Sequence, residues 1–168
     1  MTHFVADQAF NATLFSSLIK AMLEEYTESS SLELDIDFLG RDGQTYSDLY
    51  QINGDTGDNA FEFVFAGDLT LPTPGNTEGT IRYIDMATEV EGPLFHLSDF
   101  SIDYDQALVL LFTEPQLPHP LFVEIFSGGD LIELSAGNDA FNGLSGDDTI
   151  FGGADKDDLY GEAGDDTL

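Results

Sequence analysis

Five aspartates in the last third of the chain recur at intervals of nine residues without interruption: Asp130, Asp139, Asp148, Asp157 and Asp166. The positions two residues before them hold Gly128, Gly137, Gly146, Asp155 and Gly164. The positions two residues after them hold large apolar residues, namely Ile132, Phe141, Ile150, Leu159 and Leu168. A fixed short period of this kind indicates a repeat architecture, in which each unit packs mainly against its neighbours.

Each nine-residue unit combines one apolar position with one glycine-containing turn. Glycine adopts positive φ at little cost and lets the backbone approach an ion closely. Because a unit holds one strand and one turn, two units complete a flattened coil. Stacked coils then place the apolar residues inside and line the turn edges with carboxylates and carbonyls. Acid pairs such as Asp147-Asp148 and Asp165-Asp166 supply hard oxygen ligands, which suit Ca²⁺ better than Mg²⁺ or a transition metal.

This unit resembles the nonapeptide G-G-x-G-x-D-x-U-x of the RTX calcium-binding family, in which U is a large apolar residue. The opening glycines of that motif are Gly143, Gly152, Gly153 and Gly161. The resemblance implies a short parallel β-roll over residues 125–168 with about three shared ion sites. It pairs turn 128–130 with 146–148, turn 137–139 with 155–157, and turn 146–148 with 164–166. The implied metal-binding residues are Gly128, Asp130, Gly137, Asp139, Gly146, Asp147, Asp148, Asp155, Asp157, Gly164, Asp165 and Asp166.

Two departures from the repeat weaken the outer sites. Asp155 stands where the turn glycine belongs, so this turn is either strained or gains an extra ligand, and Lys156 adds a cation. We therefore expect reduced affinity there, and the best site between 146–148 and 164–166. The first unit lacks the opening glycines and is expected to be a transition from a preceding strand.

Two interpretations of residues 125–168 differ in whether the segment is ordered. Because the chain reaches Leu168 in mid-unit, the roll is expected to be truncated there. The alternative interpretation of residues 125–168 is an acidic, glycine-rich disordered tail.

The first 124 residues follow other periodicities. Apolar residues at helical spacing predict an amphipathic helix from 11 to about 26. Apolar or alternating segments bounded by Gly, Pro and Asn predict strands at 32–38, 45–52, 61–65, 80–86, 94–97, 101–104 and 108–112. These elements favour an α+β domain over 1–113, an antiparallel sheet with the N-terminal helix on one face, so that the chain is mainly β overall. Three prolines predict a stiff linker over 114–124.

Within this domain, residues 46–84 resemble the sheet region of hemophores, which are secreted haem-capturing proteins. In that family a loop Tyr and a loop His ligate the iron. Here Leu71 stands at the position that matches the Tyr, and the loop 72–78 contains no His. The resemblance implies a shared sheet fold, and a haem hypothesis would take His96 as the ligand.

Composition excludes several classes of partner. The chain carries 33 Asp and Glu against 4 Lys and Arg, a formal net charge of −29, and it has no basic stripe. Nucleic acid and anionic membrane surfaces are therefore excluded as partners. The longest apolar run, 107–112, is far shorter than the roughly 20 residues of a membrane helix, so no membrane span is expected. The absence of cysteine removes disulfides and thiolate metal sites, and residues 1–4 do not begin a cleaved signal peptide.

Catalytic motifs are absent from the sequence. It contains no H-E-x-x-H, no G-x-S-x-G and no phosphate-binding loop, so we do not expect an enzyme. We expect His3 at a frayed end, His96 as a half-buried or edge residue of a strand, and His119 between prolines. The tyrosines are expected to close the core or line the sheet edge.

Two functions are consistent with these patterns. The first is a secreted calcium-binding RTX-like protein whose repeats fold in millimolar extracellular Ca²⁺, with 1–124 as a binding or structural module of unidentified partner. The RTX resemblance implies type I secretion with an uncleaved C-terminal signal beyond Leu168. The second is a haem or small-ligand carrier built on the sheet domain. An enzyme that uses carboxylates of 1–124 is a third hypothesis, for which the sequence offers no positive sign.

Overall fold

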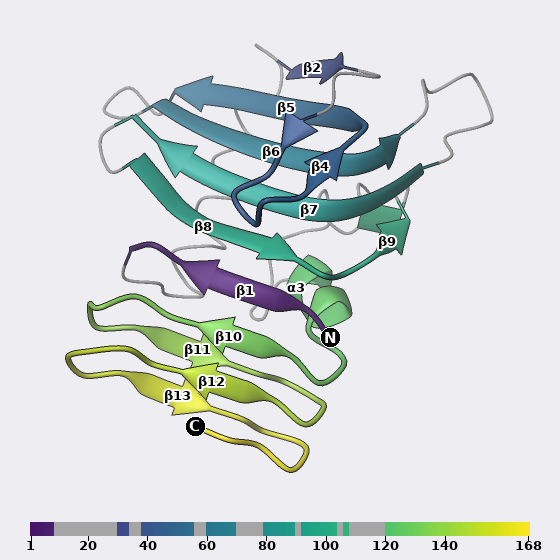
Figure 1. Ribbon diagram of the computed structural model, residues 1–168. Coiled ribbons are helices and arrows are strands. Elements are labelled where there is room, and N and C mark those ends of the chain that lie inside the picture. Colours follow the sequence, from purple (N-terminus) through teal and green to yellow (C-terminus); the bar gives the residue numbers. More distant parts are fainter. Residues whose placement is uncertain are drawn as a thin grey trace.

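The chain is mainly β, with a mixed sheet, in the computed structural model (Figure 1). The structure describes residues 1–8, 30–33, 38–55, 60–69, 79–89, 92–103, 106–107 and 120–168. The predicted helix at 11–26 and the predicted strand at 108–112 lie outside these residues, as does His119.

One sheet runs through most of the molecule in the order β12-β10-β1-β8-β7-β6-β5-β2, and β9 pairs with β7 at the side. The strands of this sheet that precede the repeats in the chain are β1 (His3–Ala6), β2 (Ser30–Glu33), β5 (Asp48–Asp55), β6 (Ala60–Leu69), β7 (Gly79–Thr88), β8 (Gly92–Ser98) and β9 (Ile102–Asp103). A separate hairpin joins β3 (Phe38–Leu39) to β4 (Thr45–Tyr46). The strands predicted at 61–65, 80–86 and 94–97 are confirmed, that at 45–52 is divided into β4 and β5, and that at 101–104 begins at Ile102.

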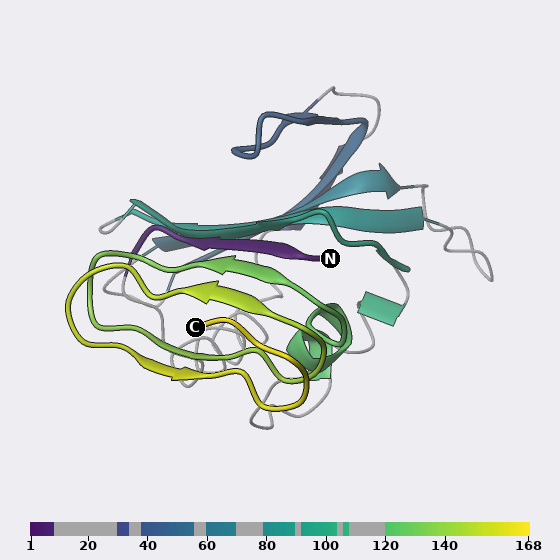
Figure 2. The ribbon, with the colours of Figure 1, turned by 60° about the horizontal axis from the view of Figure 1, so that its bottom comes forward.

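Side chains alternate between the two faces of the antiparallel part, β5 to β8. Phe65 and Ile84 are buried in the main core, while their neighbours Ala66 and Tyr83 belong to a second cluster on the other face. Figure 2 shows the β3–β4 hairpin on the side opposite to helix α3 (Pro120–Ile125) and the repeats.

The first strand corrects two predictions. β1 pairs antiparallel with β8 and parallel with β10 (Leu131–Glu133), so the sheet is mixed and not purely antiparallel. His3 therefore lies in a central strand and not at a frayed end, and its Nε2 lies 2.7 Å from Glu133 Oε2. Phe4 is fully buried. Four residues are too few to show an alternation in the sequence, and the partners of β1 lie more than 80 residues away.

Helix α3 directly precedes the first repeat, where the sequence had predicted a strand leading into it. Its residues Leu121, Phe122 and Ile125 are buried, and Pro120 stands at the first helical position, where its missing N–H costs nothing. Residues 120–124 of the predicted linker are thus helical. The division into 1–113, 114–124 and 125–168 stays a prediction.

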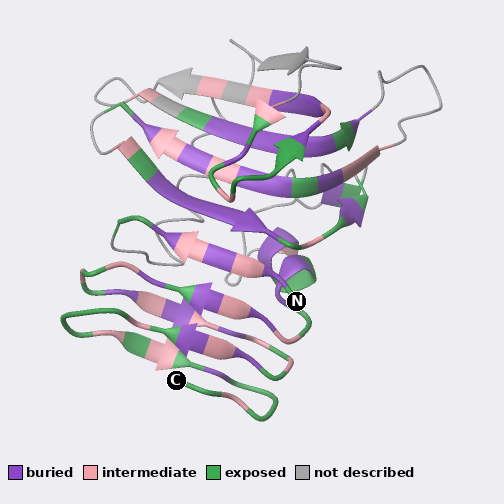
Figure 3. Ribbon diagram, in the orientation of Figure 1, coloured by how far each residue is buried: buried purple, intermediate pink, exposed green. Residues whose placement is uncertain are grey.

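The repeats form two short parallel ladders. β10 pairs with β12 (Thr149–Phe151), and β11 (Ala140–Asn142) pairs with β13 (Asp158–Tyr160), each in a register of eighteen residues. Ile132, Phe141 and Ile150 point inward and join the core of the sheet. The buried residues of the sheet and of the repeats therefore form one continuous core (Figure 3).

Candidate metal sites in the stacked turns

The turns between the repeat strands stack at the same eighteen-residue interval. One stack contains 128–130, 146–148 and 164–166, and the other contains 137–139 and 155–157 (Figure 2). Gly146 lies directly against Gly128, and Gly164 against Gly146. Gly146 and Gly164 have φ of 123° and 147°, which lie in the positive-φ region that glycine tolerates. The structure thus brings together the three turn pairs that the resemblance implied.

The repeat aspartates link consecutive turns through one carboxylate oxygen each. The backbone N–H of Asp130 donates to Asp148 Oδ1 at 2.9 Å, and that of Asp148 donates to Asp166 Oδ1 at 3.0 Å. In the other stack, the N–H of Asp139 donates to Asp157 Oδ1 at 3.0 Å. These hydrogen bonds hold each aspartate side chain between two turns.

The second carboxylate oxygen of two aspartates has no protein partner. Asp130 and Asp148 are 3% and 1% exposed, and the Oδ2 atoms of both are buried without a hydrogen bond. A buried carboxylate oxygen without a donor is costly unless a cation or a proton neutralises it. These two oxygens are therefore the strongest signal for a bound cation in the described residues.

The opening glycine of each full unit makes room for that oxygen. A methyl group on Gly143 would collide with Asp148 Oδ2, and one on Gly161 would collide with Asp166 Oδ2. On Gly152 it would lie 2.5 Å from Asp157 Oδ2. These glycines belong to the repeat motif but are not among the predicted metal-binding residues, although their fixed distance of five residues before each Asp marks them.

The protonation of the central aspartates follows from burial. Burial raises the pKa of Asp148 to about 6, and nearby carboxylates, that of Asp130 foremost, act in the same direction. Burial also raises the pKa of Asp130, although hydrogen bonds from Thr2 and the positive charge of the N-terminal amine oppose it. Both carboxyl groups lie in surroundings that disfavour an uncompensated negative charge.

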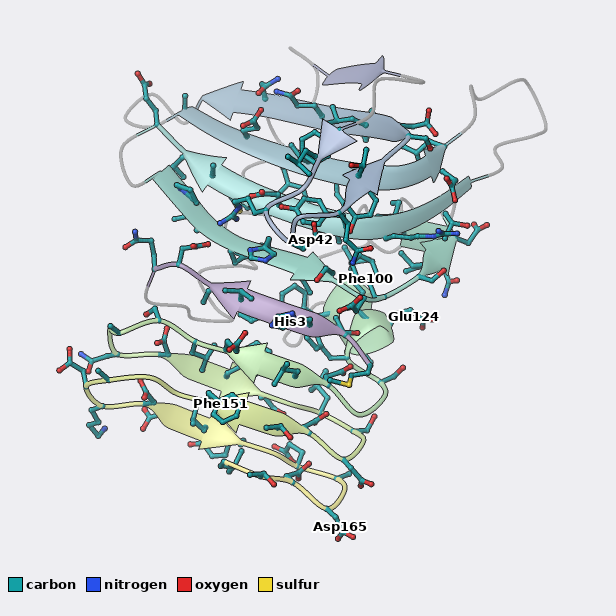
Figure 4. The ribbon with its side chains drawn as sticks, in the orientation of Figure 1. His3, Asp42, Phe100, Glu124, Phe151 and Asp165 are labelled. Carbon is teal, nitrogen blue, oxygen red and sulfur yellow. The ribbon has the colours of Figure 1, made fainter. Side chains whose placement is uncertain are left out.

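Other predicted ligands have turn-stabilising roles. Asp147 Oδ1 accepts the backbone N–H of Asp165 at 2.9 Å. Asn138, which was not a predicted ligand, has the same role in the other stack, where its Oδ1 accepts the backbone N–H of Lys156 at 3.0 Å. Both Asp147 and Asp165 are exposed, and Figure 4 shows Asp165 at the outer tip of the last turn. Asp139 Oδ2 accepts the hydroxyl of Ser135 at 2.9 Å.

Asp155 occupies its turn in a left-handed conformation. Its φ is 65° and its side chain is exposed. This backbone matches the strained alternative for this position, and ligation of an ion by Asp155 stays a prediction. The neighbouring Lys156 ammonium lies 3.5 Å from Asp158 Oδ1 and not against a repeat aspartate.

Side chains alone do not complete a coordination shell here. The ranges that the structure describes contain no group of three or more His, Cys, Asp or Glu side chains close enough to hold one ion. Ca²⁺ accepts six to eight oxygens and readily takes backbone carbonyls. The stacked turns would therefore bind an ion through one or two carboxylates together with carbonyls of the glycine-rich backbone.

His96, the ligand of the haem hypothesis, lies in β8 on the face of the sheet opposite to the main core. It is 8% exposed, and its ring centroid lies 6.0 Å from that of Tyr83. Burial, and then the charge of Arg41, lowers the pKa of His96, so the ring is neutral at pH 7. Its Nδ1 is buried without a hydrogen-bond partner.

Comparison with known proteins identifies the repeat segment. No curated protein and no solved structure matches this chain. Among the described elements there is no helix with the length and apolarity that a membrane crossing needs. Residues 126–168 match the family model of the RTX calcium-binding nonapeptide repeat, in four copies.

Proposed function

We propose that this protein binds Ca²⁺ between the stacked turns of residues 125–168 and that the ions complete the folding of this segment. The observation that carries the proposal is the pair of buried, unpartnered Oδ2 atoms of Asp130 and Asp148 within turns of RTX type. A proton is the alternative neutralising group, but only below the raised pKa of about 6 that burial gives Asp148. At neutral pH a divalent cation is the better partner.

Charge supports a large stabilisation by calcium. Residues 125–168 carry 11 acidic side chains and 1 basic side chain, which repel one another in a compact fold. Ions that bind only the folded repeats stabilise them by mass action and also relieve this repulsion.

We further propose that the protein acts outside the cell. Extracellular calcium is millimolar, which suits sites built mainly from carbonyls and a few carboxylates. The RTX repeats support export by a type I secretion system, with the repeats loose in the low-calcium cytosol and folded outside. The sheet domain then serves as a binding or structural module, and we propose no enzymatic activity for it.

A haem-carrier function finds less support. The iron would have to reach His96, which is 8% exposed and packed on Tyr83. An absorption band on adding haemin, lost in His96→Ala, would revive this alternative.

A Ca²⁺ titration of the whole chain, followed by far-UV circular dichroism at fixed ionic strength, tests the calcium proposal. We expect β signal to grow with a midpoint of roughly 0.1 to 1 mM Ca²⁺, and not with Mg²⁺. Asp148→Asn should raise the midpoint strongly. Asp158→Asn removes the same charge from an exposed strand position and serves as the matched control. An equal response to both cations, or equal midpoints in the two variants, would refute the proposal.

A further inference from the structure

The N-terminal segment occupies the place of a missing repeat at the top of the first turn stack. The backbone N–H of Thr2 donates to Asp130 Oδ1, as the N–H of Asp130 donates to Asp148 Oδ1. The N–H of Leu131 donates to the Thr2 carbonyl at 2.8 Å, as the N–H of Thr149 donates to the Asp130 carbonyl at 2.8 Å. Thr2 therefore stands where a preceding repeat would place its aspartate.

Phe4 stands where that repeat would place its apolar residue. β1 pairs Phe4 with Ile132, and β10 pairs Ile132 with Ile150, so the three side chains follow one ladder. The Phe4 ring also lies 5.1 Å from the ring of Phe141 on the other ladder, measured between centroids. Residues 2–4 thus reproduce the D-x-U part of the unit without its aspartate, from 128 residues away in the sequence.

The same strand belongs to the sheet. β1 pairs with β8 from His3↔Ser98 to Ala6↔Phe95, and the Phe4 and Phe95 ring centroids are 5.6 Å apart. Thr2 Oγ1 donates to the carbonyl of Ile125 at 3.0 Å and fixes the end of α3. Figure 1 shows β1 between β8 and β10, where it joins the sheet to the repeats. Stacked repeats need a cap on their terminal unit, because each unit is stabilised mainly by its neighbours.

We propose that residues 2–6 are the cap of the calcium-binding stack, and that Thr2 and Phe4 are positioning residues for its first turn. Thr2 holds the Asp130 carboxylate in the orientation that the internal aspartates have, and Phe4 fixes the register of β10. Thr2 has no carboxylate, so the column of repeat aspartates begins at Asp130. Because the cap is part of the sheet, the folded sheet lowers the calcium concentration at which the repeats order. This proposal rests on the calcium function argued above.

Three variants of the whole chain test the cap. Phe4→Ala removes the ladder contact, and Phe4→Leu keeps a residue type that the repeats use at this position, as at Leu159. Phe63→Ala is the matched control, because Phe63 is also fully buried but lies in β6, away from the repeats. We expect Phe4→Ala to raise the calcium midpoint by about tenfold. Phe4→Leu should restore most of the affinity, and Phe63→Ala should lower the thermal unfolding temperature with a change in the midpoint of less than about twofold.

Hydrogen exchange at one saturating calcium concentration, at which the repeats are folded, separates the cap from the calcium function. In Phe4→Ala, the amides of β10 and β12 should lose protection before those of β6 and β7; in Phe63→Ala they should not. The cap is wrong if both Phe→Ala variants expose the repeat amides equally, or if Phe4→Ala leaves them protected. If the wild-type chain shows no response to calcium but this exchange pattern holds, the calcium function fails and the cap stands.

Discussion

Asp148 Oδ1 accepts a hydrogen bond from the backbone N–H of Asp130, eighteen residues earlier, at 2.9 Å. This contact helps to join two coils of the repeat segment, and the Oδ2 atoms of Asp148 and of Asp130 are buried without a hydrogen bond. A side chain that stabilises the stack through one oxygen and offers the other to a cation couples folding to ion binding.

Gly143→Ala should weaken calcium binding, because the added methyl group would collide with Asp148 Oδ2. We expect the calcium midpoint to rise by about tenfold. Thr167→Ala is the control, since it changes a small side chain at an exposed position of the repeats. Calorimetric titration of both variants measures the effect, and similar affinities would show that the opening glycine does not protect the ligand.

Asp155→Gly should stabilise the second turn stack by about 1 kcal/mol, because Asp155 has a φ of 65° that costs glycine little. Asp155→Asn removes the charge but keeps the side chain, so it separates strain from ligation. If Asp155 contributes an oxygen to an ion, Asp155→Gly should instead bind calcium more weakly than the wild type. Thermal unfolding with and without calcium distinguishes these results.

The calcium-free protein should become more stable as the pH falls from about 6 to about 4. Burial raises the pKa of Asp148 to about 6, so in this range the folded chain retains a proton that the unfolded chain has released. The folded state thus gains stability on acidification. Above about pH 6 Asp148 is ionised in the folded state as well, so this group no longer changes the stability with pH. With calcium bound the dependence should reverse, because protons compete with the ion. Urea unfolding of wild type and Asp148→Asn at pH 4.5 and 7 measures it, and an unchanged pH dependence in the variant would contradict this assignment.

Arg41→Ala should destabilise the fold by about 1–3 kcal/mol. Its guanidinium donates to both oxygens of Asp85 at 2.7 Å, to the Asp7 carboxylate, and to the carbonyl of Phe95 at 2.6 Å. It thereby ties the β3–β4 hairpin to β7, to β8 and to the chain after β1. Arg82→Ala breaks the exposed pair with Asp68 and should cost less than about 1 kcal/mol. Equal losses in urea unfolding would show that Arg41 has no special role.

The sequence predicted the repeats well because their information is local. A period of nine fixes which turns stack, and the hydrogen bonds of Asp130, Asp139 and Asp148 follow the predicted eighteen-residue interval. The strands from 45 to 97 were predicted for the same reason, since alternation and turn residues mark them in short windows. The positive φ of Asp155 matches one of the two alternatives that its place in the motif left open.

The junction between sheet and repeats could not be predicted in this way. Thr2 and Phe4 resemble no repeat in sequence, and their place in the ladder depends on partners at Asp130 and Ile132. Helix α3 was hidden by the prolines that suggested a linker, although a proline at the first helical position favours a helix. Tertiary pairing of distant segments leaves no periodic signal in a single sequence.

The most direct test of the calcium account counts the ions. Equilibrium dialysis of the whole chain at 1 mM Ca²⁺, with excess Mg²⁺ as competitor, should give about three bound ions, one for each pair of stacked turns. Asp148 lies in two of these pairs, so Asp148→Asn should retain about one ion, whereas Asp158→Asn should retain all of them. Less than one ion on the wild-type chain, or the same number on both variants, would contradict the account.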